Sequence, residues 1–219
     1  MANRARAREL SSEFNSKDDP TGWFEPLYQE AEEGKSEVPW ADLCPNPYLL
    51  DFWKSHPQPT AGKSALVIGS GLGDDAEQLA AWGFQTTAFD ISPTAVRASR
   101  NRFPQTKVDY VTADLLSPPR SWLRRFDFVL EIYTLQVLPE TIRQKAIEKI
   151  ATLLSHSGTL LVIARGRELG EPQGEMPWPL TREELTGFCR LGLQELLFED
   201  YFDPEEQAVR RFRALYRKP

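Results

Sequence analysis

The sequence predicts an α/β protein whose mostly parallel, seven-stranded sheet is sandwiched between helices. Apolar strand-like runs alternate with helical patterns from residue 64 onward, and such alternation is typical of parallel sheets covered on both faces. A glycine-rich turn follows the first run, within SALVIGSGLGDDAE at 64–77, and two further runs end near Asp90 and Asp114. Because such sheets bind ligands at the carboxyl ends of their strands, these positions are expected to lie together.

Seven runs account for the predicted sheet, and four helical segments lie between them. The strand-like runs are SALVIG, QTTAFD, KVDYVTAD, RFDFVLEI, GTLLVIA, LQELLFEDYF and VRRFRALYRK. One helix ends at Gly83, and the next begins at Ser92 as cap with Pro93 in its first position. The last begins with a capping box of Thr181 and Glu184. In the third, ETIRQKAIEKIATLLS, one face carries Ile142, Ala146, Ile150 and Leu153.

The chain before residue 61 differs in composition from the rest. Residues 1–20 are charged and poor in branched apolar side chains, so we expect a disordered tail there. Residues 21–60 are rich in aromatic side chains and proline, which predicts a helical extension packed over an apolar surface. The domain itself is expected over 61–219. The basic end at 209–218 is interpreted as solvated surface.

Composition excludes several classes of function. The formal net charge of −6 over 219 residues disfavours a nucleic-acid partner, since phosphate binding needs a positive surface. The two cysteines, Cys44 and Cys189, are far apart and indicate neither a metal site nor a disulfide framework, as expected in a reducing compartment. The polar start and the short apolar run at Leu160–Ala164 predict no signal peptide and no membrane span. We therefore expect a cytoplasmic protein, monomeric or homodimeric.

The glycine turn departs from the dinucleotide fingerprint. Gly69, Gly71 and Gly73 form G-x-G-x-G, and Asp74 stands where the fingerprint has its last glycine. An acid at a helix N-terminus suits the helix dipole but repels a pyrophosphate. The turn thus favours a ligand with positive charge, although it could instead be a tight strand-to-helix connection that binds nothing.

Two strand-end acids suggest a nucleoside. Asp90 lies nineteen positions after Gly71, the spacing at which a carboxylate accepts hydrogen bonds from a ribose. Asp114 could accept from the exocyclic amine of an adenine. Either acid alone could be a helix cap or a loop carboxylate, but their order after the glycine turn indicates a cofactor site.

With these residues in view, the chain resembles the class I S-adenosylmethionine-dependent methyltransferases, which have a Rossmann-like fold. LVIGSGLG is similar to the family's glycine motif, AFDIS to its ribose motif, TADLL to its adenine motif and FDFVLEIYTLQVLP to its fourth-strand motif. The resemblance covers roughly residues 60–219. It implies S-adenosylmethionine as cofactor, S-adenosylhomocysteine as product, and cofactor contacts from Gly69, Ser70, Gly71, Gly73, Asp90, Ile91, Asp114, Leu115 and Glu131.

One position departs from the family. An acid usually stands two residues before the first glycine, and here Val67 occupies that position. Asp74 and Asp75 could replace the lost contact to the amino end of the ligand, although Asp74 could simply cap the helix.

The extension resembles the lid of the thiopurine and thiol/halide methyltransferase group, in the segments GWFEPLYQEAEEGKSEVPW and NPYLLDFW. That resemblance implies that an aromatic segment closes over a small acceptor. The rings expected to bind the acceptor are those of Trp23, Phe24, Tyr28 and Trp40. Each of them could equally be part of the hydrophobic core.

The segment after the fourth strand is expected to border the acceptor. Tyr133 and Gln136 are candidates for orienting it, and Glu131 for the role of base. Arg165 could bind an anionic acceptor, and 166–180 could form a loop over the site. Each of these residues could instead be structural.

The sequence therefore predicts an enzyme that transfers a methyl group from S-adenosylmethionine to a small molecule, with a thiol, a halide or a similar soft nucleophile favoured. Two alternatives stay open: a nicotinamide-dependent oxidoreductase on the same fold, and a non-catalytic protein that binds S-adenosylmethionine. No metal, nucleic-acid or membrane partner is expected.

Overall fold

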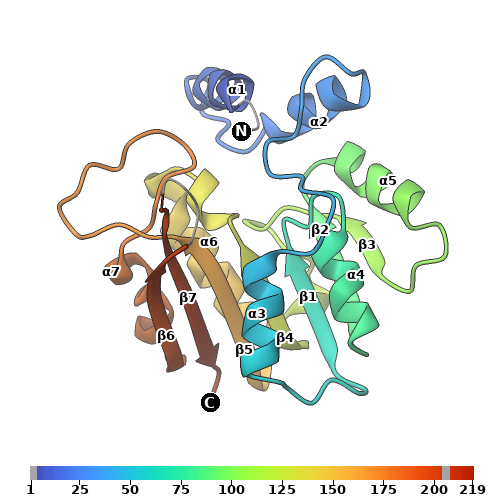
Figure 1. Cartoon of the computed structure of the whole chain (residues 1–219), viewed down its shortest axis with the longest axis vertical. Coiled ribbons are helices and arrows are strands. Elements are labelled where there is room, and N and C mark those ends of the chain that lie inside the picture. The colour runs from blue at the N-terminus through green and yellow to red at the C-terminus, as the bar shows by residue number, and fades with distance from the viewer. Residues whose placement is uncertain (1–3, 204–207) are drawn as a thin grey trace.

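The sheet has the strand order β3-β2-β1-β4-β5-β7-β6. The computed structural model describes residues 4–203 and 208–219. Strands β1 to β5 pair in parallel, whereas β7 is antiparallel to both β5 and β6. The predicted fold class is confirmed (Figure 1). The strands are β1 Ser64–Ile68, β2 Gln85–Asp90, β3 Asp109–Thr112, β4 Phe126–Ile132, β5 Leu154–Arg165, β6 Gln194–Phe202 and β7 Arg210–Arg217.

Helices cover both faces of this sheet. On one face, Leu49, Phe52 and Leu79 pack with Ala65 and Val67 of β1. The opposite face of β1 packs against the other helices, because successive strand residues point to opposite sides. The first face carries α3 Pro47–Ser55, α4 Asp74–Ala81 and α5 Pro93–Arg102, and the second α6 Glu140–Leu153, α7 Arg182–Leu185 and α8 Gly187–Arg190.

Several predicted helix starts are confirmed. The Ser92 hydroxyl accepts from the Ala95 backbone N–H at the start of α5, and Thr181 and Glu184 form the capping box of α7. The single helix expected after Thr181 is instead two short ones, because the chain turns at Thr186 between α7 and α8. Two 3₁₀ turns lie in the connections, η1 Arg120–Trp122 and η2 Leu135–Val137.

The sheet brings its carboxyl ends to one edge, and the order reverses beside β1. From β1 the chain goes to β2 and β3 on one side, and to β4 and β5 on the other. Such a switch point opens a crevice between the connections that leave in opposite directions.

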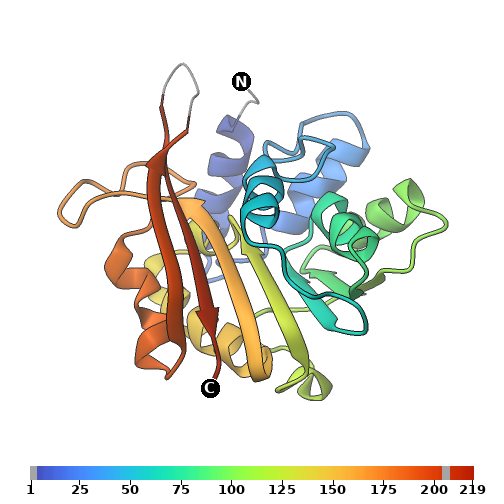
Figure 2. The same ribbon diagram turned by 60° about the horizontal axis from the view of Figure 1, so that its bottom comes forward.

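The extension lies across this edge. Helices α1 (Ala5–Asn15) and α2 (Phe24–Glu32) sit above the strand ends in two views (Figures 1 and 2). Here the structure differs from the disorder expected over 1–20, of which 1–3 lie outside the described residues. Helix α1 is held because Ala7 and Leu10 are buried in one cluster with Trp23, Leu27, Val137 and Met176.

Glu25 anchors the extension to the domain. Its carboxylate accepts from the hydroxyls of Ser92 and Thr94 and from the Thr94 backbone N–H. These groups form the N-terminus of α5, where a negative charge is favoured by the helix dipole.

The basic end is not the solvated surface expected from the sequence. Arg211 and Arg213 on β7 are both buried. Arg211 pairs with Asp203, and Arg213 with Asp51 and Glu199. Compensation by these carboxylates is what allows two guanidinium groups to be buried in the sheet. Within the described part of the chain, no helix combines the length and apolarity that a membrane crossing requires.

We expect Glu25→Ala to destabilise the protein by about 1 to 3 kcal/mol, because the three donors at the start of α5 and the exposed Gln29 side chain lose a charged acceptor. The free energy of unfolding in urea measures this change, and limited proteolysis reports whether residues 1–60 are released first. Glu33→Ala is the matched control on the same segment, since among the described residues the Glu33 side chain pairs with exposed Lys35 alone. This variant should change stability by less than about 0.5 kcal/mol. Equal effects of the two variants would contradict the anchoring role.

Candidate active site

A cavity of about 380 Å³ lies at the carboxyl edge of the sheet. Its lining comes from the turns after β1, β2, β3 and β4, from the end of β5 and from β7. The extension closes it from above through Phe24, Tyr28 and Trp40. The predicted gathering of strand-end residues is therefore what the structure shows.

The glycine turn is shaped by close contacts. Gly69 and Gly73 have φ of +58° and +93°, in the left-handed region that favours glycine. A Cβ at Gly69 would lie 2.5 Å from the Thr134 hydroxyl, and one at Gly73 would lie 2.4 Å from the Tyr110 hydroxyl. Any larger residue at Gly69 or Gly73 would therefore push the turn away from Thr134, which follows β4, or from Tyr110 on β3.

Asp90 joins this turn to the end of β2. Its two carboxylate oxygens accept from the backbone N–H groups of Gly71 and Ser92, each at 2.9 Å. Burial raises the pKa of Asp90 to about 6, and the backbone hydrogen bonds oppose that rise. The carboxylate lines the cavity with lone pairs left for a ligand.

Other predicted cofactor positions lie beside Asp90. Ile91, Asp114 and Leu115 line the cavity, and one oxygen of Asp114 accepts from the Leu116 N–H at 2.8 Å. Ser70 also lines it, with a buried hydroxyl that has no partner in the described chain. An orphaned buried hydroxyl at this place fits a polar ligand. Gly73 lies behind the lining.

The two acids after the glycine turn differ in their surroundings. Asp74 forms an ion pair with Arg102 through both carboxylate oxygens, at 2.7 and 2.9 Å. Asp75 accepts instead from the Asn46 backbone N–H at 2.7 Å, and burial raises its pKa to about 6. Since Arg102 compensates Asp74, Asp75 is the better candidate for a cationic ligand group.

Glu131 does not line the cavity, although it was predicted to contact cofactor and acceptor. Its Oε1 accepts from the backbone N–H groups of Thr134 and Leu135, at 2.7 and 2.9 Å. Its Oε2 is buried without a partner in the described chain, and burial raises the pKa to about 7. The hydrogen bonds of the carboxylate lie within the turn that follows β4. In this structure Glu131 therefore positions that turn and does not act as a base.

The acceptor-side candidates are brought together. Tyr133, Gln136 and Arg165 all line the cavity. The side chain of Gln136 accepts from the Arg165 N–H at 2.8 Å, and its backbone carbonyl accepts from the Trp178 N–H at 2.7 Å. Gln136 thereby ties the turn after β4 to β5 and to the 166–180 loop, whose Met176 and Pro177 also reach the cavity.

Of the four rings expected to bind the acceptor, three line the cavity. The Trp40 indole N–H donates to the Tyr28 hydroxyl at 3.0 Å, which fixes both rings. Trp23 is instead fully buried in the extension and stacks on Phe24, with ring centroids 3.9 Å apart. The sequence could not tell whether Trp23 binds the acceptor or belongs to the core, because this depends on how α2 packs. In the structure the Trp23 ring packs against α1.

Arg211 is a lining residue that the sequence reading missed. It lies near the start of β7, and its Cα pairs with that of Arg165 in the antiparallel register. Antiparallel pairing brings the beginning of β7 to the same edge as the ends of the parallel strands. Neither the register nor this neighbour is readable from local sequence.

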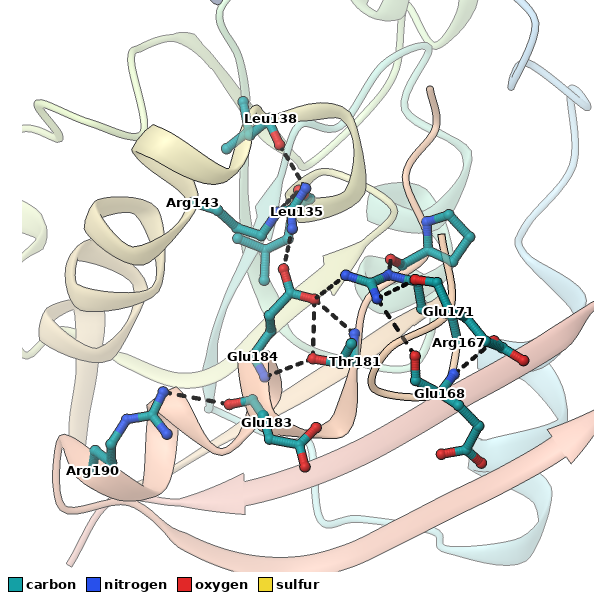
Figure 3. A network of polar contacts seen from close by, with 11 residues as sticks. Leu135, Leu138, Arg143, Arg167, Glu168, Glu171, Thr181, Glu183, Glu184 and Arg190 are labelled. Carbon is teal, nitrogen blue, oxygen red and sulfur yellow. Dashed lines mark hydrogen bonds and ion pairs between the residues drawn. The ribbon is translucent and has the colours of Figure 1, made fainter. Parts of the chain in front are cut away.

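A buried ion network supports the acceptor side (Figure 3). Arg143 donates to the carbonyls of Leu135 and Leu138 and pairs with Glu184. Glu184 also lies 3.9 Å from Arg167, which donates to the carbonyl of Pro179. The network thus connects α6, the turn after β4 and the 166–180 loop, so it fixes the wall of the cavity that these segments form.

Comparison with known proteins assigns the class of enzyme. Residues 65–158 match a family model described as a methyltransferase domain. The enzyme is a methyltransferase. The predicted dependence on S-adenosylmethionine is confirmed by this match together with the fold. The match ends before the 166–180 loop and β7, so it does not include Arg165 or Arg211.

Solved structures share the fold of the methyltransferase at low sequence identity. One concerns the conversion of a disulfide bond into a thioacetal group during echinomycin biosynthesis, with a TM-score of 0.71, 18% identity and coverage of 89% of this chain and 93% of that one. The N-methyltransferase NodS from Bradyrhizobium japonicum, in complex with S-adenosylhomocysteine, has a TM-score of 0.66, 20% identity and coverage of 88% and 98%.

A third similar structure is magnesium protoporphyrin IX methyltransferase from Synechocystis, with a TM-score of 0.61, 13% identity and coverage of 78% and 77%. No curated protein matches the chain in sequence. Among the described residues, no group of three or more His, Cys, Asp or Glu side chains is arranged to hold a metal ion.

Burial of Glu131 predicts a pH-dependent stability. Because its folded-state pKa of about 7 lies above the ordinary value of 4.5, the folded protein binds this proton more tightly than the unfolded chain. Stability from this group is therefore present below pH 4.5 and is lost as the pH rises through 7. Glu131→Gln keeps an oxygen for Thr134 and Leu135 but does not titrate.

We expect the free energy of unfolding to fall between pH 5 and 8 by on the order of 2 kcal/mol more in the wild type than in Glu131→Gln. Urea denaturation of both proteins across this range measures the difference, and the acids common to both cancel. Parallel pH profiles would show that Glu131 is not held in a raised-pKa state.

Proposed function

We propose that this methyltransferase acts on a small acceptor with a soft nucleophile, a thiol or a halide, as in the thiopurine and thiol/halide group. The observation that carries the proposal is the cavity of about 380 Å³, covered from above by Phe24, Tyr28 and Trp40. Ligand cavities start near 300 Å³, so a cavity of this size suits a compact acceptor better than a protein or a nucleic acid.

The cofactor site is assigned from the polar groups at the strand ends. In this proposal Asp90 accepts from the ribose hydroxyls, and Asp114 from the adenine amine. Asp75 faces the ammonium group, taking the part of the acid that Val67 replaces. The unpartnered Ser70 hydroxyl is the observation that fits a polar ligand here. Bound in this way, S-adenosylmethionine supplies a methyl group on a positively charged sulfur.

The protein's own contribution is alignment and exclusion of water. Methyl transfer is an in-line displacement with a neutral leaving group, so no acid is required, and placement of the nucleophile lowers the barrier. The described lining contains no histidine, and Glu131 points into its own turn. A nucleophile that arrives already ionised suits such a site better than one that must first lose a proton.

One structural neighbour supports chemistry at sulfur. The structure from the conversion of a disulfide bond into a thioacetal group covers 89% of this chain. NodS is an N-methyltransferase, so a nitrogen acceptor is the competing outcome of any test.

Incubation with isotope-labelled S-adenosylmethionine and a panel of thiols, halides, amines and phenols tests the proposal, with labelled products read by mass spectrometry. We expect turnover of thiols or halides well above that of amines and phenols. Turnover of amines alone would contradict the acceptor class. Binding of S-adenosylhomocysteine without turnover of any acceptor would favour the non-catalytic alternative.

We expect Asp75→Asn to weaken S-adenosylhomocysteine binding by about 10-fold or more, because a charged contact to the ammonium is lost. Asp74→Asn is the matched control: Arg102 already compensates Asp74, so affinity should change by less than about 3-fold. Isothermal titration calorimetry measures both. Equal losses, or a larger loss for Asp74→Asn, would contradict the assignment of Asp75.

A further inference from the structure

The charge on the carboxyl edge of the sheet changes sign along the strand order. Acids follow β3, β2 and β1, at Asp114, Asp90 and Asp75, and arginines lie on β5 and β7, at Arg165 and Arg211. Neighbouring strands are about 4.8 Å apart, so Asp114 and Asp90 are well separated from Arg211, whereas Asp75 lies near enough to Tyr133 to interact with it electrostatically. One end suits a cation and the other an anion.

Arg211 is held in place by groups on three elements. Its Nε donates to one Asp203 oxygen at 2.8 Å, its Nη2 forms an ion pair with the same oxygen at 2.8 Å, and its guanidinium lies 4.8 Å from the centroid of the Tyr48 ring. Its Nη1 donates to the Tyr133 hydroxyl at 3.0 Å. Asp203 compensates the charge of Arg211, and Arg165 and Arg4 also line the cavity.

Tyr133 presents a hydroxyl to this end of the cavity. Its backbone has φ of +64°, an unusual conformation for a tyrosine that sets the direction of the side chain. The hydroxyl accepts a hydrogen bond from Arg211. In this contact it is the acceptor, so its own proton can be donated to a ligand in the cavity.

We propose that the acceptor carries a carboxylate apart from its nucleophile, and that the Tyr133 hydroxyl donates to this carboxylate. Arg211 stands behind the hydroxyl and fixes the phenol oxygen through its Nη1 hydrogen bond. Tyr133 is then a specificity residue that holds one end of the acceptor while the other faces the cofactor side. The inference rests on the proposed function and names the substrate class of the same site.

A carboxylate fits this donor better than the nucleophile itself. A hydrogen bond to a thiolate stabilises the charge that is lost in the transition state, so it would slow the reaction. A hydrogen bond to a carboxylate that does not react is equally strong in the ground state and in the transition state. It therefore contributes to the binding and orientation of the acceptor.

Two probes that differ at the carboxylate test the inference: 3-mercaptopropionate and its uncharged methyl ester. Titration calorimetry on the protein saturated with S-adenosylhomocysteine measures their affinities without requiring turnover. We expect the wild type to bind the acid at least about 10-fold more tightly than the ester. Tyr133→Phe should remove most of that preference and leave the affinity for the ester unchanged.

Tyr201→Phe is the matched control. Tyr201 on β6 is a neighbouring tyrosine whose buried hydroxyl has no partner among the described residues, and it does not line the cavity. This variant should keep the full preference for the acid, and both variants should keep the wild-type affinity for S-adenosylhomocysteine.

Equal or absent binding of the two probes by the wild type would overturn the inference, as would an unchanged preference in Tyr133→Phe. Failure of the proposed function gives a different result: no methylated thiol is formed, whatever the probes bind. If S-adenosylhomocysteine itself does not bind, the same titrations on the free protein still read the preference for the acid.

Discussion

The site depends on one interaction, the hydrogen bonds by which the Asp90 carboxylate holds the backbone of Gly71 and Ser92. These bonds fix the glycine turn after β1 against the end of β2. They also place a buried negative charge at the switch point of the sheet. Burial opposes ionisation of this carboxylate and raises its pKa to about 6, so a ligand that donates hydrogen bonds to it gains an interaction stronger than one in water.

The remaining architecture converts this point into a closed site. The strand order places Asp114, Asp90 and Asp75 after β3, β2 and β1, and Arg165 and Arg211 on β5 and β7, and the extension covers the edge between them. Glu25 attaches the extension to α5, the helix that Ser92 caps. Because Asp90 also binds the Ser92 backbone, the extension and the glycine turn are both fixed to the start of α5. On the far side, the network around Arg143 fixes the wall formed by the 166–180 loop (Figure 3).

Local sequence was enough to predict the elements and the acids at their ends. Asp90 and Asp114 are set by where a strand ends, and Ser92 and Thr181 by where a helix begins, which short-range patterns record. The sequence could not tell that Glu131 bonds to the turn after β4, which depends on how that turn folds back on the strand. Nor could it tell that Trp23 is core, which depends on how α1 and α2 pack. Arg211 was taken for surface because its place at the edge follows from antiparallel pairing with β5, a long-range property of the fold.

The most direct test of this account is a crystal structure of the protein with S-adenosylhomocysteine. The account predicts that the ligand lies in the cavity beneath Tyr28 and Trp40, with its ribose hydroxyls on Asp90 and its sulfur facing the side of Tyr133. A ligand bound outside this cavity, or one whose ribose makes no contact with Asp90, would contradict it.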